Sequence, residues 1–160
     1  MKATDLLKRQ HREVEKLFAR VKKTDDADER EQLVEQIRSK LELHTQIEEE
    51  IFYPAYRAGA ETHKAEEAVL EAYEEHHVVK LVLGELPEID CEAESFEAKI
   101  TVLEELVQHH VEEEESSMFP DAEKKLGKGR LEQLGEELNE RVTALGADGD
   151  ADAEQPEHRA

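Results

Sequence analysis

The segments HTQIEEEIFYP (residues 44–54) and HVEEEESSMFP (residues 110–120) decide the fold of this 160-residue chain. Each begins with a histidine, carries a glutamate at the fifth position and ends with a proline, so one constant offset in numbering relates the two segments. A lone histidine precedes each segment, and the offset from His11 to His76 is shorter by a single position. An offset that holds to within one position over four landmarks indicates two matching halves. Each half supplies two histidines and one glutamate.

Apolar residues recur at helical spacing around these segments. The pattern predicts four helices, near residues 4–23, 28–58, 61–86 and 95–126, with breaks at Thr24 to Ala27, at Gly59 and at Pro87 to Glu94. Short connections favour antiparallel neighbours, so we expect an all-α fold in which residues 1–126 form an up-down-up-down antiparallel four-helix bundle. Pro54 and Pro120 fall late in the second and fourth helices, which we expect them to kink or end.

A fifth amphipathic segment follows Gly127. Its apolar residues share one side, which predicts an additional short C-terminal helix over residues 127–145, packed on the outside of the bundle. These apolar residues are Leu131, Leu134, Leu138 and Val142. Residues 146–160 offer almost nothing to bury, and we expect them to be a disordered acidic tail.

The composition excludes several classes of function. The formal net charge of −21 argues against nucleic acid and against anionic membrane surfaces as partners, because both need a basic patch. No stretch approaches the roughly 20 apolar residues of a membrane span, and no apolar run follows the first residues. A cytoplasmic protein is therefore expected, with a monomer as the default. The single cysteine, Cys91, cannot form an internal disulfide, and thiolate metal chemistry is not expected.

Six polar residues fall on the apolar faces of the predicted helices: His11, His44, Glu48, His76, His110 and Glu114. His44 and Glu48 lie one above the other on one helix face because of their i, i+4 spacing, and His110 and Glu114 repeat this pair. Similar distances from the connections place all six at about the same level. One buried histidine alone is usually a hydrogen-bonded core residue. Two buried carboxylates with no inward arginine are costly, so a metal site is the economical explanation.

The adjacent histidines require a choice. His77 and His109 lie about 100° around the helix from His76 and His110, and the repeat selects the latter pair. We expect the remaining histidines at the surface: His63, His77, His109 and His158. The other glutamates of the runs Glu48–Glu50 and Glu112–Glu115 are expected on a solvated face.

Imidazole and carboxylate ligands without thiolate suit Fe, Mn or Zn. Two histidines for each metal and two shared carboxylates leave positions for a bridging oxygen and an outside ligand, an arrangement suited to iron and to dioxygen-derived species. Tyr53 and Tyr73 lie near the ligand turns. They are candidates to donate hydrogen bonds to the ligands or to complete the coordination, and ordinary packing is the alternative for both.

With these residues in place, the chain resembles the hemerythrin-like, HHE cation-binding domain family over roughly residues 1–145. The order His, His-x-x-x-Glu, His, His-x-x-x-Glu carries the resemblance, together with EEEIFYP (48–54), EHHVVK (75–80) and HHVEEEE (109–115). The resemblance implies a non-haem centre of two Fe ions with an oxo or hydroxo bridge. By that match the histidines His11, His44, His76 and His110 would be terminal ligands, and Glu48 and Glu114 would bridge.

This chain departs from the oxygen-carrying hemerythrins at two positions. Those proteins have a further histidine where this chain has Lys80, which we expect to point outward, and an aspartate at i+5 from the fourth-helix histidine, where the repeat here selects Glu114 at i+4. Relatives with the reduced set are linked to iron or oxygen sensing and to reactions with peroxide or nitric oxide. We therefore expect a small diatomic or peroxide ligand without reversible oxygen carriage. An iron- or oxygen-sensing module is the alternative, and whether the chain is an enzyme stays open.

Overall fold

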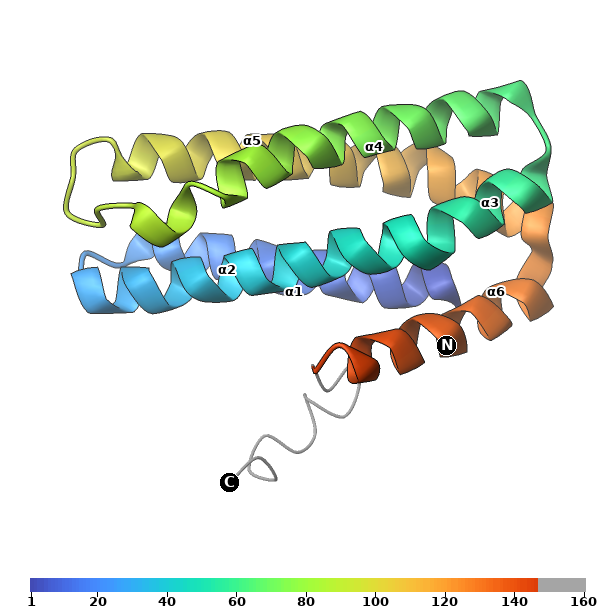
Figure 1. Cartoon of the computed structure of the whole chain (residues 1–160), viewed down its shortest axis with the longest axis horizontal. Helices are drawn as coiled ribbons and strands as arrows, with labels where there is room; N and C mark the ends of the chain where they lie inside the picture. Colours follow the sequence, from blue (N-terminus) through green and yellow to red (C-terminus); the bar gives the residue numbers. More distant parts are fainter. Residues whose placement is uncertain (147–160) are drawn as a thin grey trace.

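The computed structural model describes residues 1–146 and confirms an all-helical up-down-up-down bundle (Figure 1). Its first half contains α1 (Ala3–Lys23), α2 (Ala27–Ile47), the π-helical turn η1 (Glu48–Phe52) and α3 (Tyr53–Ala60). Its second half contains α4 (His63–Leu83), the short 3-10 turn η2 (Leu86–Glu88), α5 (Phe96–Glu113), the π-helical turn η3 (Glu114–Met118) and α6 (Phe119–Ala144). The expected disordered tail lies outside the described residues, apart from Gly146.

Local capping signals set two of the helix starts. The Asp26 side chain accepts a hydrogen bond from the Asp28 N–H at 2.9 Å and begins α2, and the Thr62 hydroxyl accepts one from the Ala65 N–H at 3.1 Å and begins α4. The break predicted at Gly59 lies two residues later, because α3 continues to Ala60 and the chain turns at Glu61 and Thr62 before α4. A Cβ at Gly59 would lie 1.9 Å from Leu126 Cδ2, so this glycine serves the close approach of α3 to α6 instead.

Pro54 and Pro120 do not end their helices. Each is near the start of an α-helix that continues directly from a π-helical turn. The Tyr53 N–H bonds the Glu48 carbonyl and the Phe119 N–H bonds the Glu114 carbonyl, which is the i to i+5 pattern of a π-helix. The wider turn accommodates the proline ring and its missing N–H, so the chain continues in helical form.

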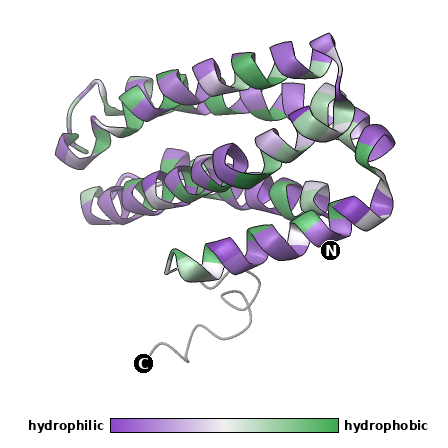
Figure 2. Cartoon of the chain, turned by 45° about the vertical axis from the view of Figure 1, so that its right-hand side comes forward, coloured by the Kyte–Doolittle hydropathy of each residue, from purple (hydrophilic) through white to green (hydrophobic). Residues whose placement is uncertain are grey.

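Two apolar clusters fill the bundle, and the six candidate ligands lie between them. Along α1, Leu7 belongs to the first cluster and Val14 to the second, with His11 between them. The helices are amphipathic, and Figure 2 shows hydrophobic and hydrophilic stretches alternating along each of them. A polar layer therefore crosses an otherwise apolar core.

The chain after Gly127 packs against the N-terminal end of α1. Gly127 takes φ 83° and ψ 163°, which bends α6 at this residue. The apolar residues of the predicted C-terminal helix are buried in the same cluster as Ala3, Leu6 and Leu7; they are Leu131, Leu134, Leu138 and Val142. The element α6 therefore consists of two helical parts divided at the non-helical residue Gly127, and the second part is the predicted C-terminal segment.

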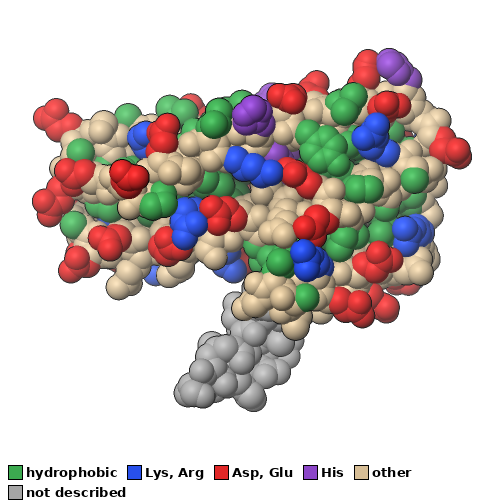
Figure 3. All heavy atoms as spheres, in the orientation of Figure 1, with side chains coloured by type: hydrophobic (Ala, Val, Ile, Leu, Met, Phe, Trp, Pro, Cys, Tyr) green, Lys and Arg blue, Asp and Glu red, His purple; other side chains and the backbone are tan. Residues whose placement is uncertain are grey.

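Acidic side chains dominate the surface. Figure 3 shows Asp and Glu side chains spread over the face in view, with fewer Lys and Arg among them, as expected from 42 acidic and 21 basic residues. None of the helices within residues 1–146 combines the length and the apolar composition that a membrane span requires.

Gly135 in α6 is in close contact with the N-terminal backbone. A Cβ at this position would lie 2.0 Å from the Met1 carbonyl oxygen and 3.1 Å from the Ala3 nitrogen. We expect Gly135→Ala to lower the free energy of unfolding by about 1–3 kcal/mol, measured by urea denaturation, because backbone atoms must shift. Gly129→Ala is the matched control, since its Cβ meets nothing within 4 Å. Equal stability of the two variants would contradict this close approach.

Candidate metal centre

The structure brings all six predicted residues together in the polar layer. His11 comes from α1, His44 from α2, His76 from α4 and His110 from α5, while Glu48 and Glu114 begin the two π-helical turns. Each of the six is at most 6% exposed. Each of the four long helices α1, α2, α4 and α5 therefore contributes a histidine to one buried site.

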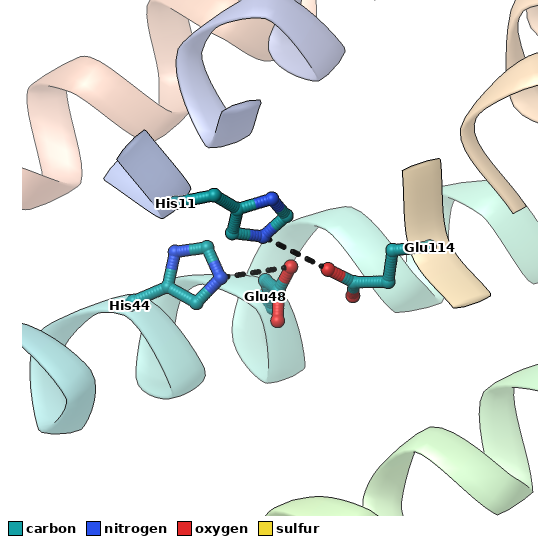
Figure 4. A group of neighbouring side chains, drawn as sticks. All are labelled: His11, His44, Glu48 and Glu114. Atoms are coloured by element: carbon teal, nitrogen blue, oxygen red, sulfur yellow. Dashed lines mark ion pairs between the residues drawn. The ribbon is translucent and has the colours of Figure 1, made fainter. Parts of the chain in front are cut away.

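The six residues form two positions. At the His11–His44 position, His11 Nε2 lies 3.1 Å from Glu114 Oε1 and His44 Nε2 lies 3.2 Å from Glu48 Oε2 (Figure 4). At the His76–His110 position, His76 Nε2 lies 3.1 Å from Glu48 Oε1 and His110 Nε2 lies 3.2 Å from Glu114 Oε2. Each carboxylate thus presents one oxygen to each position, which is the arrangement of a bridging ligand.

The ring orientations of the histidines are set by hydrogen bonds at their other nitrogens. His11 Nδ1 donates to Glu115 Oε2 at 2.6 Å, and His44 Nδ1 donates to Gln10 Oε1 at 2.7 Å. In the other half, His76 Nδ1 donates to Glu49 Oε2 at 2.7 Å and His110 Nδ1 donates to Glu75 Oε1 at 2.6 Å. All four partners are oxygen acceptors, so Nδ1 carries a proton and Nε2 faces the cluster, where it can give its lone pair to a metal ion.

These four partners are functional residues that the sequence prediction missed. Glu49 and Glu115 were expected on a solvated face, but their side chains are only 25% and 24% exposed and contact ligand candidates. The signal was present in the repeat. Glu49 and Glu115 occupy matching positions of the two halves, each directly after a candidate glutamate, while Gln10 and Glu75 match as the residues directly before the lone histidines.

The donor set fits metal ions. An Nε2 lone pair facing a carboxylate oxygen places two acceptors together, and buried acceptors require a proton or a cation between them. Among residues 1–146, four atoms of the site are buried without a hydrogen-bond partner: His11 Nε2, His44 Nε2, Glu48 Oε2 and Glu114 Oε1. A cation coordinated by imidazole and carboxylate satisfies such atoms, and iron, manganese and zinc all accept these ligands.

The protein groups alone shift the pKa values in the direction that attracts positive charge. Burial raises the pKa of Glu48, but the charge of His44 and hydrogen bonds from the histidines outweigh it and hold this pKa well below the ordinary value. Burial lowers the pKa of His110, but the charge of Glu114 outweighs it and raises this pKa well above the ordinary value. The carboxylates are therefore anionic, and the imidazoles must share protons with them or receive a cation.

Tyr53 enters the site, whereas Tyr73 does not. The Tyr53 hydroxyl lies 2.9 Å from Glu48 Oε1 and 2.5 Å from Glu114 Oε2, and it lies 3.2 Å from the Nε2 atoms of both His76 and His110. The ring of Tyr73 packs edge-on against Tyr53, with centroids 5.6 Å apart. Within the described chain, no hydrogen bond joins Tyr73 to the six candidates, so packing is the role that the structure supports for it.

The π-helical turn is what brings Tyr53 into the site. In a regular α-helix, residue i+5 points away from residue i, but the wider π turn places Tyr53 nearly above Glu48. The same turn in the second half places Phe119 above Glu114, and its ring stacks on His11 with centroids 5.9 Å apart and an interplanar angle of 5°. Equivalent turns thus deliver a phenol to one position and a plain phenyl ring to the other.

The residues that the sequence placed outside the site lie at the surface. The side chains of His63, His77 and His109 are 86%, 64% and 68% exposed, and His158 lies outside the described residues. Lys80 points outward as expected and pairs with Glu49 at 2.9 Å. It therefore reaches the site only through the carboxylate that orients His76.

Comparison with known proteins agrees with this geometry. The family model described as hemerythrin HHE cation binding domain matches residues 2–122. The crystal structure of a hemerythrin HHE cation binding domain-containing protein from Mycobacterium kansasii matches with a TM-score of 0.78 at 25% identity, over 90% of this chain and 86% of that chain. A DNA nickase from Nostoc sp. is 28% identical over 138 residues, and the matched region spans 86% of this chain but only 38% of that protein.

Proposed function

The chain belongs to the hemerythrin HHE cation-binding domain family, and from this premise we propose that it is a non-haem di-iron protein that binds or reacts with dioxygen, hydrogen peroxide or nitric oxide. The two-position arrangement of Nε2 atoms and shared carboxylates is the observation that carries the proposal. His11 and His44 would hold one ion and His76 and His110 the other, with Glu48 and Glu114 shared. Iron in such a site supplies redox chemistry and open positions for a small ligand.

The space beside the histidines supports a small ligand. A cavity of about 20 Å³ borders all four histidines, and its remaining walls are mostly apolar. These walls include Val14, Leu41, Val79, Val107 and Val111. That volume holds about one water-sized molecule. Diatomic molecules and peroxide fit such a space, whereas an organic substrate does not.

The protein groups supply selectivity and hydrogen bonding. The apolar walls exclude bulk water, which strengthens every electrostatic interaction inside the site. The Tyr53 hydroxyl is a donor beside the His76–His110 position, 2.9 Å from Glu48 Oε1, where it can hydrogen-bond a bound ligand or a carboxylate. Lys80 and Arg12 pair with Glu49 and Glu115 and so hold the carboxylates that orient His76 and His11.

An iron- or oxygen-sensing role without catalysis is the second candidate. The positions of the candidate metal ligands support it, because each of the four long helices supplies part of the site. Metal loading is therefore coupled to the packing of the whole bundle, and the fold could report the state of the metal. Nicking of DNA is not carried over from the Nostoc relative, since 42 acidic residues against 21 basic ones repel a phosphate backbone.

Anaerobic reconstitution with Fe(II) followed by addition of peroxide or nitric oxide tests the proposal. We expect elemental analysis to give two irons per chain, and the visible spectrum to change on addition of either ligand. The variant with both Glu48→Gln and Glu114→Gln should lose both properties. Turnover of many equivalents of peroxide would identify an enzyme, and a single spectral change without turnover would identify a sensor. One iron or none would contradict the proposal, and repeated reversible binding of dioxygen without oxidation would contradict the expectation that the chain is not an oxygen carrier.

A further inference from the structure

We infer that the two metal positions are unequal and fill in order, the His11–His44 position first and the His76–His110 position second. This inference rests on the proposed two-metal function and adds an order of binding to it. One departure from the internal repeat carries it, Tyr53 against Phe119, together with the distribution of buried atoms that lack a further hydrogen-bond partner.

The unpartnered atoms all face one position. Within residues 1–146, the site atoms buried without a further hydrogen-bond partner are His11 Nε2, His44 Nε2, Glu48 Oε2 and Glu114 Oε1. They are the four donor atoms of the His11–His44 position, and they face only one another, at 3.1 Å and 3.2 Å. The equivalent four atoms of the other position each lie within 3.2 Å of the Tyr53 hydroxyl. An ion entering the first position satisfies four buried acceptors and displaces no protein group.

The second position is already capped by a protein hydroxyl. The Tyr53 oxygen lies 2.5–3.2 Å from the four donor atoms and to one side of them, so a metal ion there must replace these hydrogen bonds or take the phenol as a further ligand. The repeat counterpart, Phe119, has no oxygen to place in the first position and stacks on His11 instead. The difference between the two positions therefore follows from one hydroxyl group on otherwise equivalent π turns.

The histidine partners differ in the opposite sense. Glu49 and Glu75 make His76 and His110 stronger donors, because a carboxylate partner increases the basicity of a ligating imidazole. His44 has the neutral amide of Gln10 instead. Changing such a partner typically alters metal affinity about 10- to 100-fold. One amide weakens the first position, but four unpartnered buried acceptors favour it more strongly, so the phenol decides the order.

Stepwise anaerobic titration of the metal-free full chain with Fe(II), monitored by calorimetry, tests this order. We expect two steps with dissociation constants about 10-fold or more apart. The ultraviolet absorbance of tyrosine should change in the second step only. His44→Ala should remove the tight step, whereas His76→Ala should leave it intact and remove the weak one. Circular dichroism checks that both variants remain helical.

Tyr53→Phe provides the sharper variant, with Tyr73→Phe as its matched control. Removing the phenol oxygen should tighten the second step and bring it closer to the first, while Tyr73→Phe should change neither step. Two ions bound in a single step by the wild type, a tight step lost in His76→Ala but kept in His44→Ala, or a second step weakened by Tyr53→Phe would each overturn the inferred order. A wild-type chain that binds one ion or none would instead contradict the di-iron function itself.

Discussion

Removal of the metal is expected to lower the free energy of unfolding by about 4 kcal/mol or more when the free metal exceeds its dissociation constant roughly 1,000-fold. The reason is mass action, since the ions bind the folded chain and the unfolded chain has no assembled site. Chelation also leaves two carboxylates, Glu48 and Glu114, 0% and 1% exposed in the core. Thermal unfolding of the Fe(II)-loaded and chelated protein under anaerobic conditions measures the difference.

The double variant Glu48→Gln plus Glu114→Gln separates the role of the carboxylates in metal binding from their role in the fold. Its unfolding temperature should not respond to metal. It should nevertheless be more stable than the chelated wild type, because two neutral amides avoid both the desolvation of two buried carboxylates and the repulsion between them. A double variant that cannot fold would show that the carboxylates stabilise the bundle independently of metal.

Alanine at the buried member of each histidine pair is expected to remove metal, while alanine at its neighbour is not. His110→Ala and His76→Ala should each lose at least one of the two ions, since each removes an Nε2 donor that lies 3.1–3.2 Å from a carboxylate oxygen of the site. His109→Ala and His77→Ala are the matched controls, because those side chains are 68% and 64% exposed. Elemental analysis after reconstitution measures the difference.

The two pairs also test the helix register. Equal metal loss within either pair would mean that α4 or α5 turns a different face toward the centre of the bundle than the one described above. Retention of two ions in His110→Ala would show that the site does not depend on this donor. Circular dichroism of each variant distinguishes a lost ligand from a lost fold.

Most of the fold could be predicted from the sequence, because helical periodicity is a local property. The spacing of apolar residues locates the four long helical segments closely, and the internal repeat identifies the six polar residues that the structure brings together. Gly59 shows the limit of local signals. A glycine is read as a break, and only its contact with Leu126 reveals that it permits two helices to approach closely.

The sequence by itself determined which helix faces are buried. It also determined which polar residues fall on those apolar faces, and that these residues form two matching halves. The tertiary structure decided which other polar residues contact the six candidate ligands. Glu49 and Glu115 orient histidines of other helices, and Tyr53 enters the site while Tyr73 packs behind it. The physical reason is that such contacts depend on the axial shift and rotation of one helix against another. Those parameters are set by the packing of the whole core and by two π-helical turns, and the periodicity of a single helix does not contain them.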